Sequence, residues 1–308
     1  MIRILNALTV DVEEYFQVSA FDHLVPRAAW DRFESRVERS TDRILEMLAE
    51  ANVRGTFFVL GWLARKNPAL VRRIASLGHE IGSHSFKHRL VYELTPAEFR
   101  RDLQEAREAI EDACGQSVMS FRAPSFSITA RSEWALDVLI EEGYAYDSSI
   151  FPIRHDRYGM SGAPRHAHLM TRAAGSIWEV PPSTVQIAGA TLPVAGGGYF
   201  RLLPYELTRR AIGRLNDLEQ RPAIVYLHPW ELDPDQPRMP VTGLTRFRHY
   251  VNLGRTERRL RQLLADFSFG PISSVLVQQF ADAKLQPAGV APAKAASATS
   301  YRVASGIV

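Results

Sequence analysis

Short apolar runs alternate with amphipathic segments along most of this chain, and this alternation is the feature that most restricts its fold. Residues 55–60 and 223–227 are continuous apolar runs of the kind that form strands buried on both faces. Residues 67–78 and 95–115 carry apolar side chains at helical spacing, and each begins with a capping residue followed by proline. Strands that alternate with helices favour parallel βαβ units, which predicts an α/β barrel or a doubly wound sheet.

The composition excludes several classes of protein. Of the 308 residues, 46% are hydrophobic and 23% are charged, and the formal net charge is only +3. Such a chain is expected to bury a sizeable core, and it lacks the clusters of lysine and arginine that bind nucleic acid. The single cysteine, Cys114, excludes an internal disulfide. We find neither a membrane span nor a signal peptide pattern, so we expect a cytoplasmic location, with the inner face of the membrane as an alternative.

We expect one domain rather than two, because no repeat and no clear linker interrupts residues 1–284. Residues 285–308 are rich in alanine, proline and serine, and this composition predicts a disordered tail. Residues 153–172 and 233–250 have no clear period and are predicted to be long irregular stretches. Residues 273–277 are predicted to be the last strand.

Five clusters of reactive residues fall at the ends of predicted strands. They are Asp11-Val12-Glu13-Glu14, His84 with His88, Arg122-Ala123-Pro124-Ser125-Phe126, Tyr146-Asp147-Ser148-Ser149 and His228-Pro229-Trp230. Each cluster alone could be a helix cap, a salt bridge or a turn, and a lone pair of histidines four residues apart is a weak sign of a metal site. Barrels and doubly wound sheets place their sites at the carboxyl ends of strands, so the five together predict one functional site.

These clusters resemble the motifs of the NodB-like polysaccharide deacetylases, carbohydrate esterase family 4, from about residue 8 to residue 228. The chain is further similar to the branch that accompanies exosortase (PEP-CTERM) exopolysaccharide gene clusters. The shared features are the opening Asp11-Val12-Glu13-Glu14-Tyr15-Phe16, the run His228-Pro229-Trp230-Glu231-Leu232-Asp233 and the later Tyr250-Val251-Asn252-Leu253. The resemblance implies a distorted seven-stranded (β/α) barrel, with residues 1–284 as the catalytic domain and a family extension from about residue 229.

The resemblance also implies catalytic roles for four residues. Asp11 matches the catalytic base, and Arg122 matches the arginine that holds the carboxylate of this base. His228 matches the acid that protonates the departing amine, and Asp147 matches the aspartate that orients this acid. A base on one side and an acid on the other suit hydrolysis of an amide, whose amine leaves poorly unless it is protonated.

The metal ligands implied by the resemblance depart from the common family motif at one position. His84 and His88 match two imidazole ligands of one divalent ion, with zinc expected first and cobalt, manganese, nickel or iron(II) as alternatives. The usual motif has two adjacent aspartates, base and then ligand, but Val12 follows the base here. Some relatives use Asp-x-Asp, which makes Glu13 the carboxylate ligand. Strand alternation agrees with Glu13, and Glu14 remains the fallback.

Substrate contacts are expected from four further residues. The backbone N–H of Ser125 is expected to help bind the oxyanion, and Phe126 stands one position later than the usual aromatic residue of the family. Tyr199 follows three glycines and could meet a sugar, although these glycines could equally form a flexible turn. Trp230 could stack on a pyranose ring or fill the top of the barrel.

The implied function is metal-dependent N-deacetylation of an amino-sugar polysaccharide or oligosaccharide, with release of acetate. One alternative is an allantoinase-like or other cyclic-amide hydrolase of the same fold, although the long loops favour an extended substrate. Another is a catalytically silent glycan-binding protein of an export complex, against which the complete set of reactive residues argues. The sequence does not predict the oligomeric state.

Overall fold

The structure is a computed structural model that describes residues 4–155, 158–194 and 196–280. Its strands are β1 (Leu5–Val12), β2 (Thr56–Val59), β3 (Glu80–Ser83), β4 (Ser120–Phe121), β5 (Tyr146–Asp147), β6 (His168–Arg172), β7 (Gly175–Glu179), β8 (Thr184–Ile187), β9 (Ala190–Pro193), β10 (Ile224–Leu227) and β11 (Ser268–Gly270). Its α-helices are α1 (Val37–Glu50), α2 (Gly61–Lys66), α3 (Pro68–Ser76), α4 (Pro96–Cys114), α5 (Trp134–Glu141), α6 (Gly197–Leu202), α7 (Tyr205–Asp217), α8 (Gly243–Tyr250), α9 (Leu253–Asp266) and α10 (Ile272–Phe280). Short 3-10 turns are η1 (Ser19–Phe21), η2 (Arg27–Arg32), η3 (Val91–Glu93), η4 (Pro124–Phe126) and η5 (Pro229–Leu232).

The main sheet is mostly parallel and confirms the predicted α/β fold. Its strand order is β10-β1-β2-β3-β4-β5-β7-β6, and every neighbouring pair is parallel except β6 with β7. The segment after β7 reaches β10, because the Ser183 N–H donates to the Ile224 carbonyl at 3.1 Å and the Ile224 N–H donates to Ser183 Oγ at 2.7 Å. The two ends of the parallel sheet are thus linked, as expected for a distorted barrel.

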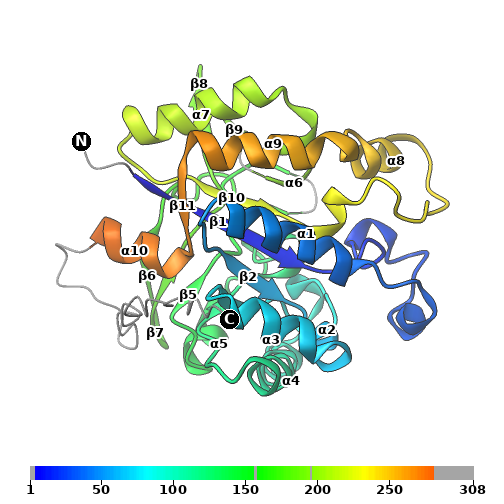
Figure 1. Cartoon of the computed structure of the whole chain (residues 1–308). Helices are drawn as coiled ribbons and strands as arrows, with labels where there is room; N and C mark the ends of the chain where they lie inside the picture. Colours follow the sequence, from blue (N-terminus) through cyan, green and yellow to red (C-terminus); the bar gives the residue numbers. More distant parts are fainter. Residues whose placement is uncertain (1–3, 156–157, 195, 281–308) are drawn as a thin grey trace, which may run out of the picture.

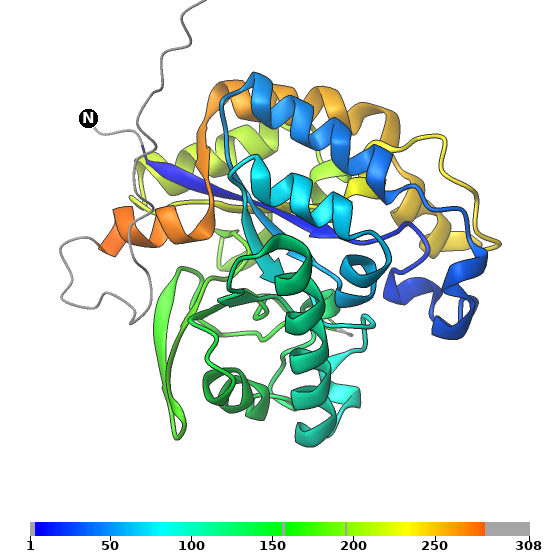
Figure 2. The same cartoon turned by 60° about the horizontal axis from the view of Figure 1, so that its bottom comes forward.

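Helices cover this sheet on both sides of β1. Figure 1 shows α7 and α9 on one side of β1 and α2 to α5 on the other. In Figure 2 the light-green β6–β7 hairpin forms one edge of the molecule. Helix α4 illustrates how the sequence sets these elements: the Glu98 N–H donates to Thr95 Oγ1 at its start, and Gly115 ends it at a φ of 68°.

The parallel strands end nearly level, and this alignment positions the site. Val10 pairs with Leu227 on one side of β1, and Val12 pairs with Val59 on the other. The alignment continues through further pairs, Val59 with Ser83, Ser83 with Phe121, Phe121 with Asp147 and Asp147 with Glu179. The residues that follow these positions therefore meet at one edge of the sheet, as parallel topology requires.

Three predictions about elements were wrong in whole or in part. The predicted last strand at residues 273–277 is helix α10, and the neighbouring β11 was not predicted. Strand β6 lies within the predicted irregular stretch 153–172, and α8 lies within 233–250. The predicted tail, residues 285–308, lies outside the described residues. Among the described residues, none of the helices is both long and apolar enough to cross a lipid bilayer.

Candidate functional site

Glu13, His84 and His88 form a buried group that could hold a metal ion. One ligand atom from each of them lies within 4.8 Å of the others. The His88 Nε2 is 2.9 Å and the His84 Nε2 is 4.0 Å from the same oxygen, Glu13 Oε2. Burial alone would raise the pKa of Glu13, but the neighbouring imidazoles, His88 first, outweigh burial and lower this pKa to about 2. Glu13 is thus the carboxylate of the group, as strand alternation predicts.

The imidazole of His84 has the form that a metal ligand needs. Its Nδ1 lies 2.7 Å from the carbonyl oxygen of Arg122, which can only accept, so Nδ1 carries the proton. Burial lowers the pKa of His84 to about 4, so the ring is neutral at pH 7 and its Nε2 has a free lone pair. With one carboxylate and two imidazoles at one point, the donor set fits a divalent ion such as zinc with positions left open for water and substrate.

The loop that carries the two histidines turns sharply and is held from outside. Ser85 and His88 have positive φ angles of 67° and 52°, and the ring centroids of His84 and His88 lie 5.4 Å apart in an edge-on contact. The His88 N–H donates to Ser85 Oγ at 3.0 Å. Arg27, from the segment between β1 and α1, donates to the carbonyl oxygens of Lys87 at 2.7 Å and His88 at 2.8 Å. The N-terminal segment therefore holds the loop that carries His84 and His88 in place.

Asp11 and Arg122 form a buried ion pair beside this group. Arg122 Nη1 donates to Asp11 Oδ1 at 2.8 Å and to Thr9 Oγ1 at 2.7 Å. Its Nε donates to the Ser148 carbonyl at 3.2 Å, and its Nη2 donates to Ser148 Oγ at 2.8 Å. The guanidinium is fully buried and lies 4.4 Å from the ring centroid of Phe58. The structure therefore places Arg122 where it holds the Asp11 carboxylate, as the sequence predicts.

His228 lies next to both carboxylates at the end of β10. Its Nε2 is 3.8 Å from Asp11 Oδ2 and 3.7 Å from Glu13 Oε1. Its Nδ1 is 3.3 Å from Glu231 Oε2. Burial lowers the pKa of His228, but the hydrogen bond to Glu231 and the charges of nearby carboxylates outweigh it and raise this pKa to about 9. Glu231, which the sequence analysis did not single out, is therefore the carboxylate that contacts the Nδ1 of His228.

The structure corrects the prediction for Asp147 because this carboxyl group lies among other partners. Asp147 Oδ1 accepts a hydrogen bond from Ser149 Oγ. Its carboxyl group also interacts with that of Glu179, which is level with it on β7. Burial raises the pKa of both carboxyl groups, that of Glu179 well above its usual value, and the contacts described for Asp147 do not include His228.

Of the two roles expected for Trp230, the structure supports packing at the top of the barrel rather than stacking on a sugar, because the residue is only 6% exposed. Its ring stacks on His228 at a centroid distance of 5.1 Å and on His249 at 4.3 Å. Its Nε1–H donates to Glu13 Oε1 at 3.1 Å. Trp230 thus links the carboxylate of Glu13 to the imidazole of His228.

The remaining predicted substrate residues have mixed outcomes. Phe126 is 6% exposed and packs edge-on against Phe151 and Tyr226, so it is a core residue next to Arg122. Ser125 is partly exposed, has a φ of 51° and shares a hydrogen bond of 2.8 Å with Ser19 Oγ.

Tyr199 is partly exposed on α6, just after Gly196 and Gly197. A Cβ atom on Gly196 would lie 2.2 Å from the ring of Tyr226, and one on Gly197 would lie 2.9 Å from it. The glycines therefore serve the close approach of the backbone to Tyr226, and a role for Tyr199 towards substrate stays a prediction.

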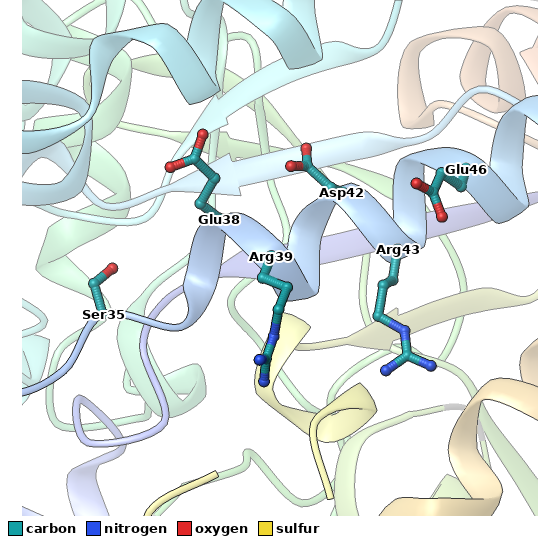
Figure 3. Close-up of a pocket in the computed structure, with 6 residues that line it drawn as sticks. All are labelled: Ser35, Glu38, Arg39, Asp42, Arg43 and Glu46. Atoms are coloured by element: carbon teal, nitrogen blue, oxygen red, sulfur yellow. The ribbon is translucent and has the colours of Figure 1, made fainter. Parts of the chain in front are cut away.

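A surface hollow lies apart from these residues, along helix α1. Figure 3 shows Glu38 and Asp42 on one side of this helix and Arg39 and Arg43 on the other. The hollow is lined by Ser35, Glu38, Arg39, Asp42, Arg43 and Glu46. Several of these groups are ion-paired with neighbouring elements, Arg39 with Asp233 and Arg43 with Glu257. The hollow contains none of the predicted site residues, and we read it as a solvated charged face.

Two family models match the chain. Residues 24–145 match the model described as polysaccharide deacetylase, and residues 148–277 match a model described as a domain of unknown function (DUF3473). The first match contains His84, His88 and Arg122, and the second contains His228 and Glu231.

Two proteins named as deacetylases are similar in sequence to part of the chain. A chitooligosaccharide deacetylase of Sinorhizobium fredii is 38% identical over 100 residues, which cover 32% of this chain and 44% of that protein. A peptidoglycan-N-acetylglucosamine deacetylase of Bacillus cereus is 34% identical over 98 residues, which cover 32% of this chain and 36% of that protein. The chain thus spans less than half the length of either relative.

A solved structure extends the likeness to the whole fold. A protein of Mycobacterium smegmatis, provisionally described as a polysaccharide deacetylase, shares the fold with a TM-score of 0.58 at 20% identity over 94% of each chain. Over residues 24–145, the chain is therefore similar to the polysaccharide deacetylase family.

Proposed function

We propose that the protein removes acetyl groups from the amino sugars of a polysaccharide or oligosaccharide in a metal-dependent hydrolysis. The observation that carries this proposal is the meeting of three metal-type donors, a buried Asp–Arg pair and a histidine at one edge of the sheet. Relatives named as chitooligosaccharide and peptidoglycan-N-acetylglucosamine deacetylases support an N-acetylated glycan as substrate.

The proposed chemistry assigns one task to each group. A divalent ion held by Glu13, His84 and His88, with zinc as our first choice, would supply Lewis-acid chemistry that polarises a carbonyl and lowers the pKa of water towards about 7. Asp11, held by Arg122, accepts the proton from the attacking water.

The second half of the reaction releases the amine. His228 donates a proton to the amide nitrogen as the C–N bond breaks, because an unprotonated amine is a poor leaving group. The oxygen of water ends in acetate, and the sugar keeps a free amine. Asp11 and His228 suit these opposite tasks because the Nε2 of His228 lies only 3.8 Å from Asp11 Oδ2, so both groups face one reacting centre.

The direct test is to incubate the zinc-loaded protein with N-acetylglucosamine oligomers and to measure acetate and free amine. We expect equal amounts of both products, and a loss of about 10²–10⁴ in rate in Asp11→Asn and in His228→Ala. Both variants should keep their metal, since neither removes one of the three donors. A protein that binds metal but releases no acetate from any N-acetylated glycan would refute the proposal.

We also propose membership of the exopolysaccharide-associated branch, with residues 1–284 acting as one catalytic domain. The opening Asp11–Phe16 run and the run from His228 to Asp233 support the branch. The pairing of Arg36 Nε with Asp233 Oδ2 at 2.8 Å supports the joint action of early and late parts of the chain. Faster deacetylation of N-acetylated exopolysaccharide than of peptidoglycan would support this assignment, and the reverse preference would contradict it.

A further inference from the structure

The histidine that the proposed reaction uses as its acid is held by a second buried ion pair, that of Arg201 and Glu231. We propose that Glu231, fixed in place by Arg201, is the positioning residue that orients His228 for proton donation. This inference rests on the proposed deacetylation, and it gives the region of unknown function, residues 148–277, a defined part in the reaction.

Glu231 contacts His228 twice. Its Oε2 accepts the backbone N–H of His228 at 2.9 Å and lies 3.3 Å from the Nδ1 of the same residue. Its other oxygen, Oε1, accepts the Arg201 Nε–H at 2.6 Å. The Glu231 side chain is only 1% exposed, so water does not compete for either hydrogen bond.

The side chain of Arg201 is held in place by hydrogen bonds to backbone carbonyl oxygens. Its Nη1 donates to the carbonyl oxygens of His249 at 2.8 Å and Val251 at 3.0 Å, and its Nη2 donates to that of Arg248 at 3.0 Å. Its own carbonyl oxygen accepts hydrogen bonds from Asn252 and Arg259. The guanidinium is 2% exposed, so it holds the Glu231 carboxylate in one direction and compensates its buried charge.

This arrangement fixes which nitrogen of His228 faces the reaction. A carboxylate only accepts hydrogen bonds, so Glu231 keeps a proton on Nδ1, and proton donation is left to Nε2. Nε2 is the nitrogen that lies 3.8 Å from Asp11 Oδ2 and 3.7 Å from Glu13 Oε1. Trp230, stacked on the imidazole, restrains the plane of the ring.

The kinetic test compares two substrates that differ in the leaving group. N-acetylglucosamine oligomers lose an amine that must be protonated, whereas 4-nitrophenyl acetate loses a phenolate that leaves without a proton. In zinc-loaded full-length Glu231→Gln we expect kcat on the amide to fall at least about 100-fold, within the range typical of general acid catalysis. We expect KM, zinc content and the rate of ester hydrolysis to stay within about threefold, since the base and the metal donors are untouched.

Two further variants act as controls. Glu231→Asp keeps a carboxylate and should retain more amide activity than Glu231→Gln. Glu257→Gln removes a carboxylate that pairs on the surface with Arg43 and Arg261, and it should leave both rates unchanged. An equal fall of the amide and ester rates in Glu231→Gln would show a merely structural role, and no fall at all would show no role; either result overturns the proposal.

A spectroscopic measurement keeps this test separate from that of the proposed function. The ¹⁵N–¹H spectrum of histidine-labelled protein should show a proton on Nδ1 of His228, assigned by its loss in His228→Gln, and this signal should vanish or broaden in Glu231→Gln. If the wild-type protein releases no acetate from any amide, the deacetylase proposal fails while the spectrum still decides the positioning of His228. The same signal in wild type and in Glu231→Gln, or none in either, would overturn the inference.

Discussion

The indole N–H of Trp230 donates to Glu13 Oε1 at 3.1 Å, while the other oxygen of the same carboxylate faces His84 and His88. One oxygen of Glu13 is therefore occupied, and the carboxylate can present only its second oxygen to an ion. A hydrogen bond of this kind orients a metal ligand and contributes to metal affinity without touching the metal.

Trp230→Phe should weaken zinc binding, because it keeps an aromatic ring against His228 and removes the N–H that holds Glu13. We expect the dissociation constant to rise about 10–100-fold, measured by competition with a chelator. Trp178→Phe is the matched control, because Trp178 packs on Phe280 in a different cluster and should leave zinc affinity unchanged. Equal affinities in wild type and Trp230→Phe would contradict the assigned role.

Glu13→Gln and Glu14→Gln should differ in metal content. Glu14 accepts hydrogen bonds from Ser35 Oγ and the Arg36 N–H, so it ties the chain to the start of α1 and faces no imidazole in the contacts described. We expect Glu13→Gln to lose zinc on dialysis and Glu14→Gln to keep it, as measured by elemental analysis. Zinc loss confined to Glu14→Gln would exchange the two assignments.

Arg122→Lys should lower activity although it keeps the charge. A lysine cannot reach Asp11, Thr9 and Ser148 together, since one ammonium replaces a planar fork. We expect the deacetylation rate to fall at least about tenfold and the free energy of unfolding to fall by about 1–3 kcal/mol, because a buried partner loses its hydrogen bond. Steady-state kinetics and urea denaturation measure the two effects. The exposed Arg101→Lys serves as control and should change neither.

The buried imidazole of His79 should make the protein less stable in acid. The Gly55 N–H donates to His79 Nδ1 at 3.1 Å, which needs a neutral ring, and burial, aided by Arg54, lowers the pKa of His79 from 6.5 to about 4. Between these values the unfolded chain binds more protons than the folded one. The stabilisation is therefore complete above about pH 6.5 and is lost as the pH falls towards about 4, by about 1–3 kcal/mol.

Urea denaturation of wild type and His79→Asn at several pH values checks this expectation. The Asn Oδ1 can still accept the Gly55 N–H but does not titrate, so the difference in free energy between the two proteins should shrink as the pH falls from about 6.5 to about 4. Parallel profiles would assign the acid sensitivity to other groups.

Gly196→Ala should destabilise the fold, because the new Cβ would lie 2.2 Å from the ring of Tyr226 at a backbone φ of 151°. We expect a loss of about 1–3 kcal/mol in the free energy of unfolding, together with lower activity, since this ring also packs edge-on against His228. Gly254→Ala is the control: nothing lies within 4 Å of its Cβ in helix α9, and a gain of about 0.5–1 kcal/mol is expected. Thermal unfolding of both variants distinguishes these outcomes.

Reactive residues at strand ends could be predicted from the sequence because parallel strands bring their carboxyl ends together whatever the loops do. This reasoning found the group of Glu13, His84 and His88 and the pair of Asp11 with Arg122. The same reasoning could not predict which carboxylate contacts His228, because this contact depends on the conformation of the turn after β10. The three-residue spacing from His228 to Glu231 was the available signal, since this spacing lets a carboxylate reach back to a backbone N–H.

Helix α10 shows another limit of sequence reasoning. Its β-branched and apolar residues favoured a strand, and a run this short does not distinguish the two periods. In the structure, side chains from two strands cap the start of this helix. The Ile272 N–H donates to Thr56 Oγ1, and the Ser273 N–H donates to Glu80 Oε2. These caps come from strands more than 190 residues away, so local sequence does not reveal them.

The pairing of Val10 with Leu227 sets the spacing between the two groups that exchange protons in the proposed reaction. Asp11 directly follows Val10, and His228 directly follows Leu227. The distance between their side chains is therefore set by the backbone hydrogen bonds of the paired strands and not by the loops. A slip of one residue between β10 and β1 would move the histidine by about 3.3 Å and turn its side chain to the opposite face. The surrounding loops can therefore change in length to suit different glycans while the distance between proton acceptor and proton donor stays constant.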